Sequence, residues 1–284
     1  MAVFYNQATL SYNDTTTNSN IVTGEIIEVL SASKTSLQTD YTNNEVITYL
    51  INIINSGSTA VSGVSITDNL GAFAFEQTQV VPLTYIDGSA RYYSNGVLQG
   101  TPTVTDSSPL VISGLTVPAN GNVLVAYQAR VNEFAPLATG STIENVATIT
   151  GATISTPVEV SNVLTVQDTA ELTISKSISP STVVENGQVT YTFVIQNTGN
   201  TPASAADDVV VTDNFDSVLS NISVAYNSVA WSSPANYTYD EDTGEFSTVA
   251  GQITVPAATY TQDSSTGEIL INPGVGILTV TGTV

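Results

Sequence analysis

An internal repeat constrains this chain more than any other feature of its sequence. Lys34 lies fifteen residues before Tyr49, and Lys176 lies fifteen residues before Tyr191. Similar residues recur around both pairs. A spacing that returns in this way is the mark of tandem structural units. The 284 residues are enough for two domains, each with its own core. We therefore expect two copies of one domain.

The repeated segments read as β-strands. Residues 46–57 and residues 189–199 each alternate apolar and polar side chains and end in an Asn-x-Gly turn. A Thr-Asp-Asn triplet follows each of them, at residues 67–69 and 212–214. Val, Ile, Thr and Tyr are frequent, and no stretch repeats apolar residues at helical spacing for three turns. The pattern predicts an all-β protein of two antiparallel sandwiches.

The second copy ends before the first one does. After the strand at residues 124–131, the first copy continues through a strand at 144–150 to a further strand near 158–166. The second copy reaches only the matching strand at 277–284. The missing piece has a counterpart at the front of the chain, because residues 5–11 read like 144–150. The second sandwich is therefore predicted to lack its last hairpin.

These comparisons divide the chain into an arm at residues 1–28, a complete domain at 29–168 and an unfinished domain at 169–284. An unfinished sandwich exposes a strand edge and an open core, which an extended segment of another molecule can fill. The alternation of the arm suits that task. Its predicted inward, assembly-strand face consists of Phe4, Asn6, Ala8 and Leu10.

Donation to another molecule is the preferred interpretation. Residues 20–34 reproduce the spacing of 162–176, so they should follow the path that a linker takes between consecutive domains. Folding back onto the second copy would then require crossing roughly 40 Å, about the limit of a dozen stretched residues. The alternative is an N-terminal extension paired locally on the first domain. A head-to-tail contact that does not close gives an open filament.

Each copy also holds a lysine and an acid in matching places, and an asparagine begins both the final strand of the first copy and the matching strand of the arm. We expect Lys34 to meet Asp68 and Asn145 within one molecule. Lys176 and Asp213 should meet the donated Asn6 of another. Such triads can form an isopeptide bond, in which the acid promotes attack of a neutral lysine on the asparagine amide. A buried lysine–aspartate ion pair needs the same residues, so the sequence leaves both readings open.

The chain resembles the conserved-repeat, immunoglobulin-like domains found in tandem on bacterial surface proteins. The motifs that carry the resemblance are Ser-Lys-Thr or Ser-Lys-Ser, the strand Thr-Tyr, Asn-x-Gly, Thr-Asp-Asn and Asn-x-Ala-Thr. The resemblance covers essentially the whole chain and implies the immunoglobulin-like sandwich. A looser likeness to subunits of endospore surface appendages implies a place on the spore. These motifs specify the fold far better than the function.

Composition narrows the classes of function. The formal net charge of −21 disfavours nucleic acid and anionic membranes as partners. Without Cys or His the chain lacks the usual nucleophile, base and metal ligand, so we expect no enzyme beyond a single self-directed turnover, no cofactor and no metal. The acidic run at residues 240–245 lacks the ligand spacing of a calcium loop and is expected to be a solvated turn. No secretory signal is evident at the start.

The sequence thus predicts a structural subunit whose partner is another copy of itself. It would assemble head to tail into an extracellular surface fibre by strand donation, with the Lys–Asn bonds as covalent locks. The alternative is a monomeric surface adhesin whose ligand the sequence does not identify.

Overall fold

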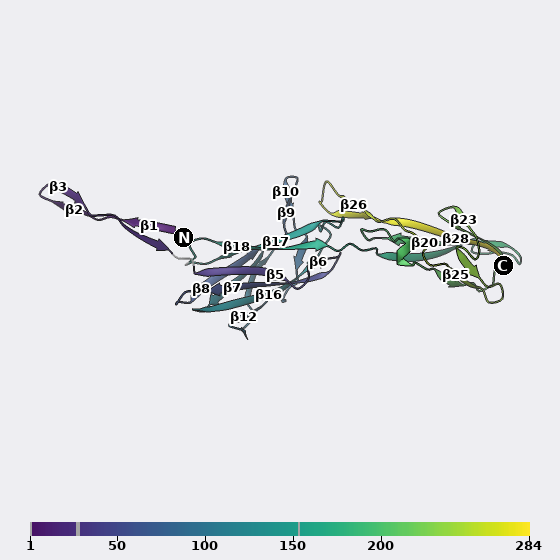
Figure 1. Ribbon diagram of the computed structural model, residues 1–284, viewed down its shortest axis with the longest axis horizontal. Coiled ribbons are helices and arrows are strands. Elements are labelled where there is room, and N and C mark those ends of the chain that lie inside the picture. Colours follow the sequence, from purple (N-terminus) through teal and green to yellow (C-terminus); the bar gives the residue numbers. More distant parts are fainter. Residues whose placement is uncertain (1, 27–28, 153) are drawn as a thin grey trace. The chain divides into compact units, whose positions relative to one another are not determined.

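The structure, a computed structural model, describes residues 2–26, 29–152 and 154–284. It forms two compact units, one made of Met1–Asn132 and Ile143–Leu164 and the other of Glu133–Thr142 and Thr165–Val284. The domain boundary predicted at residue 28 lies outside the described residues. Figure 1 shows strands throughout. The described residues hold no α-helix, only the 3₁₀ turn η1 (Ala205–Asp207).

Two antiparallel sheets make up the first unit. One has the order β13-β12-β16-β7-β5, with β11 also on β16, and the other has the order β14-β15-β8-β17-β18-β6. The strands of the first sheet are β13 (Val97–Leu98), β12 (Arg91–Ser94), β16 (Gly121–Val131), β7 (Val46–Asn55), β5 (Leu30–Ser36) and β11 (Leu83–Tyr85). Those of the second are β14 (Thr103–Ser107), β15 (Leu110–Val117), β8 (Val61–Asp68), β17 (Thr142–Thr150), β18 (Val158–Val166) and β6 (Asp40–Tyr41). A short hairpin joins β9 (Phe73–Phe75) to β10 (Thr78–Val80).

Alternation along the strands builds the core of this unit. In β7, Ile47, Tyr49, Ile51 and Ile53 are fully buried, and the intervening side chains are partly or wholly exposed. The same alternation runs through β16, β8 and β17. One face of each sheet is therefore apolar, and burying the two faces together removes that surface from water. The predicted β-sandwich class is confirmed.

The second unit repeats the first sheet but has a smaller second layer. Its main sheet has the order β19-β20-β28-β22-β23, and a three-stranded sheet has the order β21-β25-β24. The strands are β19 (Leu172–Ser179), β20 (Gln188–Asn197), β28 (Gly274–Thr283), β22 (Ser220–Tyr226), β23 (Val229–Trp231), β21 (Thr212–Asn214), β25 (Glu245–Thr248) and β24 (Tyr237–Tyr239), beside a hairpin of β26 (Thr259–Gln262) and β27 (Ile269–Asn272). Phe193 and Leu278 of the main sheet share one core with Phe215 and Phe246.

The Asn-x-Gly turns have the same hydrogen bonds in the two units. Asn55 Oδ1 accepts a hydrogen bond from the backbone N–H of Gly57, and Asn197 Oδ1 accepts one from that of Gly199, both at 2.9 Å. In each unit the asparagine Nδ2 also donates to carbonyl groups of the loops that follow. The buried side chain of the asparagine therefore fixes the same turn in each unit.

The arm is a hairpin of its own. β1 (Ala2–Asn6) pairs with β4 (Val22–Ile26), and β2 (Thr9–Tyr12) pairs with β3 (Thr15–Asn18). Asn13 and Asp14 form the two-residue turn and both have positive φ, as a type I′ hairpin turn requires. Side chains of residues 4–23 are exposed throughout. Among the described residues, the strands of the arm pair only with each other.

Candidate functional site

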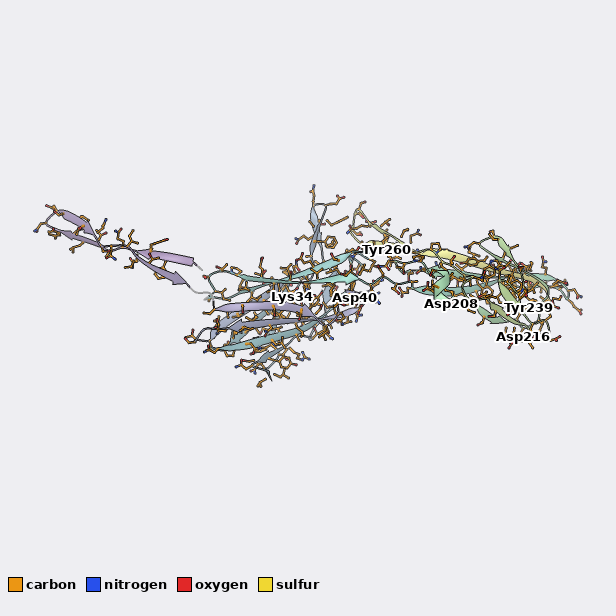
Figure 2. All side chains as sticks on the ribbon, viewed as in Figure 1. Lys34, Asp40, Asp208, Asp216, Tyr239 and Tyr260 are labelled. Atoms are coloured by element: carbon orange, nitrogen blue, oxygen red, sulfur yellow. The ribbon has the colours of Figure 1, made fainter. Side chains whose placement is uncertain are left out.

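The first lysine–aspartate centre lies inside the first unit. Lys34 stands on β5 (Figure 2), and Asp68 ends β8 in the opposite sheet. Lys34 Nζ donates a hydrogen bond to Asp68 Oδ2 at 2.7 Å, and both side chains are 0% exposed. The ring of Tyr49 lies beneath the amine, 5.0 Å from Nζ to the ring centroid. A charge pair with no access to water is therefore part of the sandwich core.

Two further side chains complete the centre. Tyr127 Oη donates to Asp68 Oδ2 at 2.5 Å, and Asn145 Nδ2 donates to Tyr127 Oη at 3.1 Å. Asp68 Oδ1 accepts from the backbone N–H of Leu70 at 3.0 Å. The structure thus joins the three residues predicted for the intramolecular bond, Lys34, Asp68 and Asn145, in one hydrogen-bond network.

Burial changes the proton affinities at this centre. Desolvation lowers the pKa of Lys34 from 10.5 to about 8, although the Asp68 carboxylate acts in the opposite direction. Desolvation also raises the pKa of Tyr127 well above its usual value, and the charge of Asp68 adds to that shift. Asn145 Oδ1 is buried without a hydrogen-bond partner among the described residues, which is costly for a carbonyl. A neutral amine is accessible here at mildly alkaline pH, beside an amide with an unpaired oxygen.

The second centre has the same ion pair in an open setting. Lys176 on β19 contacts Asp213 on β21, and their side chains are 40% and 17% exposed. Lys176 Nζ lies 4.6 Å from the ring centroid of Tyr191 and 5.2 Å from that of Phe215. A hollow of about 600 Å³ over β21, β24 and β25 includes Asp213 in its lining. Water therefore reaches the ion pair of the second unit, whereas the matching ion pair of the first unit is sealed from water.

The two centres differ in the strands that pair beside the aspartate. In the first unit β8 has neighbours on both sides, with Asp68 opposite Leu110 of β15 and opposite Ala147 of β17. In the second unit β21 pairs only with β25 among the described residues, where Asp213 stands opposite Phe246. Among the described residues of the second unit, no side chain occupies the place of Asn145.

Apolar side chains near Lys176 are exposed to solvent in the second unit. Ile174 and Ile178 lie two residues either side of Lys176 on the same face of β19, and both are exposed. In the first unit, Tyr41 of β6 follows Lys34 and is buried beside β18. Val183 follows Lys176 at the same spacing in the second unit, and its side chain is exposed. These three residues and Lys176 form what we call the acceptor face.

The arm carries the predicted donor residues in exposed positions. Phe4, Asn6 and Leu10 are all exposed, and Asn6 stands opposite Val22 in the arm hairpin. In the single chain Asn6 belongs to neither lysine centre. Its counterpart strand, β17, buries the four matching side chains, which are Ile143, Asn145, Ala147 and Ile149. The inward face predicted for the arm is therefore the face that β17 turns toward the core.

One residue of the first centre, Tyr127, was not predicted from the sequence. The alternation of β16 places it inward, opposite Tyr49. The matching position in the second unit is Val280, which stands opposite Tyr191. A comparison of the two repeats at this position is the signal that could have found it.

The acidic run at residues 240–245 is a hairpin turn. Asp240 Oδ1 accepts hydrogen bonds from the backbone N–H groups of Asp242 and Thr243, and Asp240 N donates to Glu245 O. Within the described ranges no three acidic side chains are grouped in a way that would hold a metal ion. Nor does the described part of the chain contain a helix of the length and apolar character that spanning a membrane requires.

Comparison with known proteins gives structural likenesses at low sequence identity. No model of a known protein family matches the chain, and no curated protein sequence matches it. The major pilin subunit of Bacillus cereus is 13% identical over 95% of this chain and 73% of that chain, with a TM-score of 0.36. The pilus backbone of Streptococcus pneumoniae is 11% identical over 86% of this chain and 55% of that chain, with a TM-score of 0.34.

A smaller structure is similar over one part of the chain. The collagen-binding subdomain of the Enterococcus faecalis surface protein ACE is 10% identical over 50% of this chain and 99% of that chain, with a TM-score of 0.32. These three likenesses concern the β-sandwich fold alone.

Proposed function

We propose that the chain is a structural subunit that assembles head to tail by strand donation. The arm hairpin of one copy occupies, in the second unit of the next copy, the place that β17 and β18 hold in the first unit. One observation carries the proposal: among the described residues β21 lacks the second neighbour that β8 has, and residues 5–11 of the arm resemble residues 144–150 of that neighbour. The assembled subunits would form a fibre on the cell exterior. Immunolabelling of spores tests whether the fibre lies on the endospore.

Docking satisfies groups that the single chain leaves open. Phe4, Ala8 and Leu10 would cover the acceptor face, and the backbone of β1 and β2 would pair with the free edge of β21. Asn6 would then stand beside Lys176 and Asp213 as Asn145 stands beside Lys34 and Asp68. Burial of apolar surface supplies most of the free energy, at about 25 cal/mol per Å².

A matched pair of variants tests strand donation. Ala8→Glu introduces a charge at the position of buried Ala147, so it should abolish fibres in negative-stain micrographs of the purified chain. Tyr5→Glu places the same charge where β17 itself carries exposed Glu144, so its fibres should remain. Deleting residues 1–12 should also abolish fibres and leave the first unit folded. Fibres that persist without the arm would rule out donation, and a chain that stays monomeric would favour the adhesin alternative.

We further propose that amide bonds lock the two centres. Lys34 Nζ attacks Asn145 Cγ, the new C–N bond replaces Cγ–Nδ2, and ammonia leaves. Lys176 and the Asn6 of a neighbouring copy undergo the same exchange, promoted by Asp213 as Asp68 promotes the first. Each bond lowers the mass by about 17 Da, one ammonia.

Intact-mass measurement tests the intramolecular bond, and boiling fibres in detergent tests the intermolecular one. Lys34→Arg should abolish the mass loss, because the guanidinium stays protonated. Fibres that dissociate wholly to monomer would exclude the second bond without excluding donation.

A further inference from the structure

Tyr127 occupies the space between the acid and the amide that would react. Its Oη donates to Asp68 Oδ2 at 2.5 Å and accepts from Asn145 Nδ2 at 3.1 Å. The ring is held by a stacked contact with Tyr49, with 5.4 Å between the centroids. A buried phenol therefore lies between the predicted proton carrier and the nitrogen that would leave.

Amide exchange needs a proton at that nitrogen. The amide anion is too poor a leaving group to depart unprotonated, so Nδ2 must gain a proton before the Cγ–Nδ2 bond breaks. Lys34 is the source, because the amine must lose two protons, one before attack and one after. Asp68 receives the first of these directly from Lys34 Nζ. No direct hydrogen bond joins Asp68 to Asn145 Nδ2 among the described residues; the one that Nδ2 makes is to Tyr127.

We propose that Tyr127 relays the proton from Asp68 to the departing nitrogen of Asn145. This inference rests on the proposed Lys34–Asn145 bond. Lys34 gives a proton to Asp68 and, as a neutral amine, attacks Cγ. Attack makes Cγ tetrahedral, so Nδ2 gains a lone pair and the hydrogen bond to Oη can reverse. Asp68 then passes its proton to Tyr127 Oη while Oη gives its own proton to Nδ2, which leaves as ammonia. The second proton of the attacking nitrogen returns to Asp68 and then to solvent or ammonia. One C–N bond forms and one breaks, and no oxidant is needed.

Two properties of the phenol suit it to this task. Its raised pKa keeps it protonated at neutral pH, so it holds a proton to give. Within the described part of the chain, the hydrogen bonds of its hydroxyl are those to Asp68 and Asn145, the two groups that the relay would join.

The second centre lacks this relay. Val280 stands at the position of Tyr127, so Asp213 has no phenol at that place. The bond between molecules should accordingly form much more slowly than the bond within one molecule.

Intact masses of the full chain, taken at intervals after cell-free synthesis, test the relay. Tyr127→Phe should lose ammonia about 100-fold more slowly than the unmodified chain. Tyr85→Phe is the matched control, because its ring lies 6.5 Å from that of Tyr127 and its hydroxyl contacts neither Asp68 nor Asn145. Near-ultraviolet circular dichroism checks that both variants fold.

Each outcome decides between the two proposals. Loss of ammonia from Tyr127→Phe at the unmodified rate would overturn the relay and leave the bond intact. No loss from the unmodified chain would overturn the bond and the relay together. If Tyr127→Phe does not fold, Val280→Tyr provides the test instead. Its fibres should become resistant to boiling detergent at an earlier time after assembly than fibres of the unmodified chain. Equal rates for those fibres would count against the relay.

Discussion

The two lysine–aspartate pairs are one motif in two environments. Lys34 and Asp68 are wholly buried, whereas Lys176 is 40% exposed although it occupies the matching strand position. The ion pair itself does not explain the difference, since both pairs are in contact. In the first unit β17 and β18 lie beside the strand of the aspartate, whereas among the described residues of the second unit no strand pair takes their place. A strand pair supplied from outside should therefore convert the second environment into the first.

Removing the lysines should give the largest contrast between the units. In a chain whose amide bond is blocked by Asn145→Thr, Lys34→Met leaves Asp68 buried without its counter-charge, so we expect a loss of about 3–5 kcal/mol in the unfolding free energy of the first unit. Lys176→Met removes a solvated charge and should cost the second unit under ~1 kcal/mol. Trp231 is the only tryptophan and reports on the second unit in urea titrations, and tyrosine circular dichroism reports on both. Equal losses would mean that burial does not distinguish the centres.

Supplying the missing strands should stabilise only the second unit. A peptide of residues 2–26, added at a hundred times its dissociation constant to the chain without its arm, should raise the unfolding free energy by about 2.7 kcal/mol. Trp231 fluorescence should follow the change. The same peptide with Ala8→Glu serves as the control. A gain in the first unit instead would show that the arm docks elsewhere.

Alkaline pH should stabilise the first unit when its amide bond is blocked. Asn145→Thr keeps Lys34 as a free amine with a folded-state pKa of about 8 and an unfolded value of 10.5. Between these values the unfolded state binds the extra proton, so the unfolding free energy rises with pH, by roughly 2–3 kcal/mol from pH 8 to 10. Measurement stops at pH 10, because buried tyrosines with raised pKa, such as Tyr49, reverse the sign above it.

The chain without the substitution provides the contrast. An amide nitrogen does not titrate, so a cross-linked centre should show no rise that Lys34 could cause. A rise of equal size in the unsubstituted protein would identify the centre as an ion pair.

The smallest effect should come from the acceptor face of the monomer. Ile174 is 56% exposed, so Ile174→Ser should change the unfolding free energy of the free second unit by under ~0.5 kcal/mol. The same change should raise the protein concentration at which fibres appear, because the side chain is buried only after docking. An unchanged threshold would remove Ile174 from the interface.

Much of the fold could be predicted from the sequence, because the alternation of apolar and polar residues along the strands and the Asn-x-Gly turns are local signals. They predicted β7 and β20 within a residue or two. The pairing of each lysine with its aspartate followed from the repeat, since two copies of a triad in matching strands are improbable without contact.

Other features depend on packing across the sandwich and were not predicted. Tyr127 meets Asp68 only because β16 lies opposite β8 in the facing sheet, a relation that no local pattern contains. The arm was expected to be a strand or a hairpin, but the turn and register of its hairpin were not predicted. Its turn at Asn13 and Asp14 has no glycine, and its register shifts between β1 and β2, where Ser19 donates to Ala8 O.

The shortness of β21 has a consequence for the protein before it meets a partner. An open sheet edge is a template on which any extended chain can aggregate. Here the edge spans only Thr212–Asn214 and carries a carboxylate in the middle, so a random apolar strand gains few backbone bonds there. Under the proposed strand donation, this short edge should therefore favour the arm, whose asparagine and small alanine suit it, over a random apolar strand.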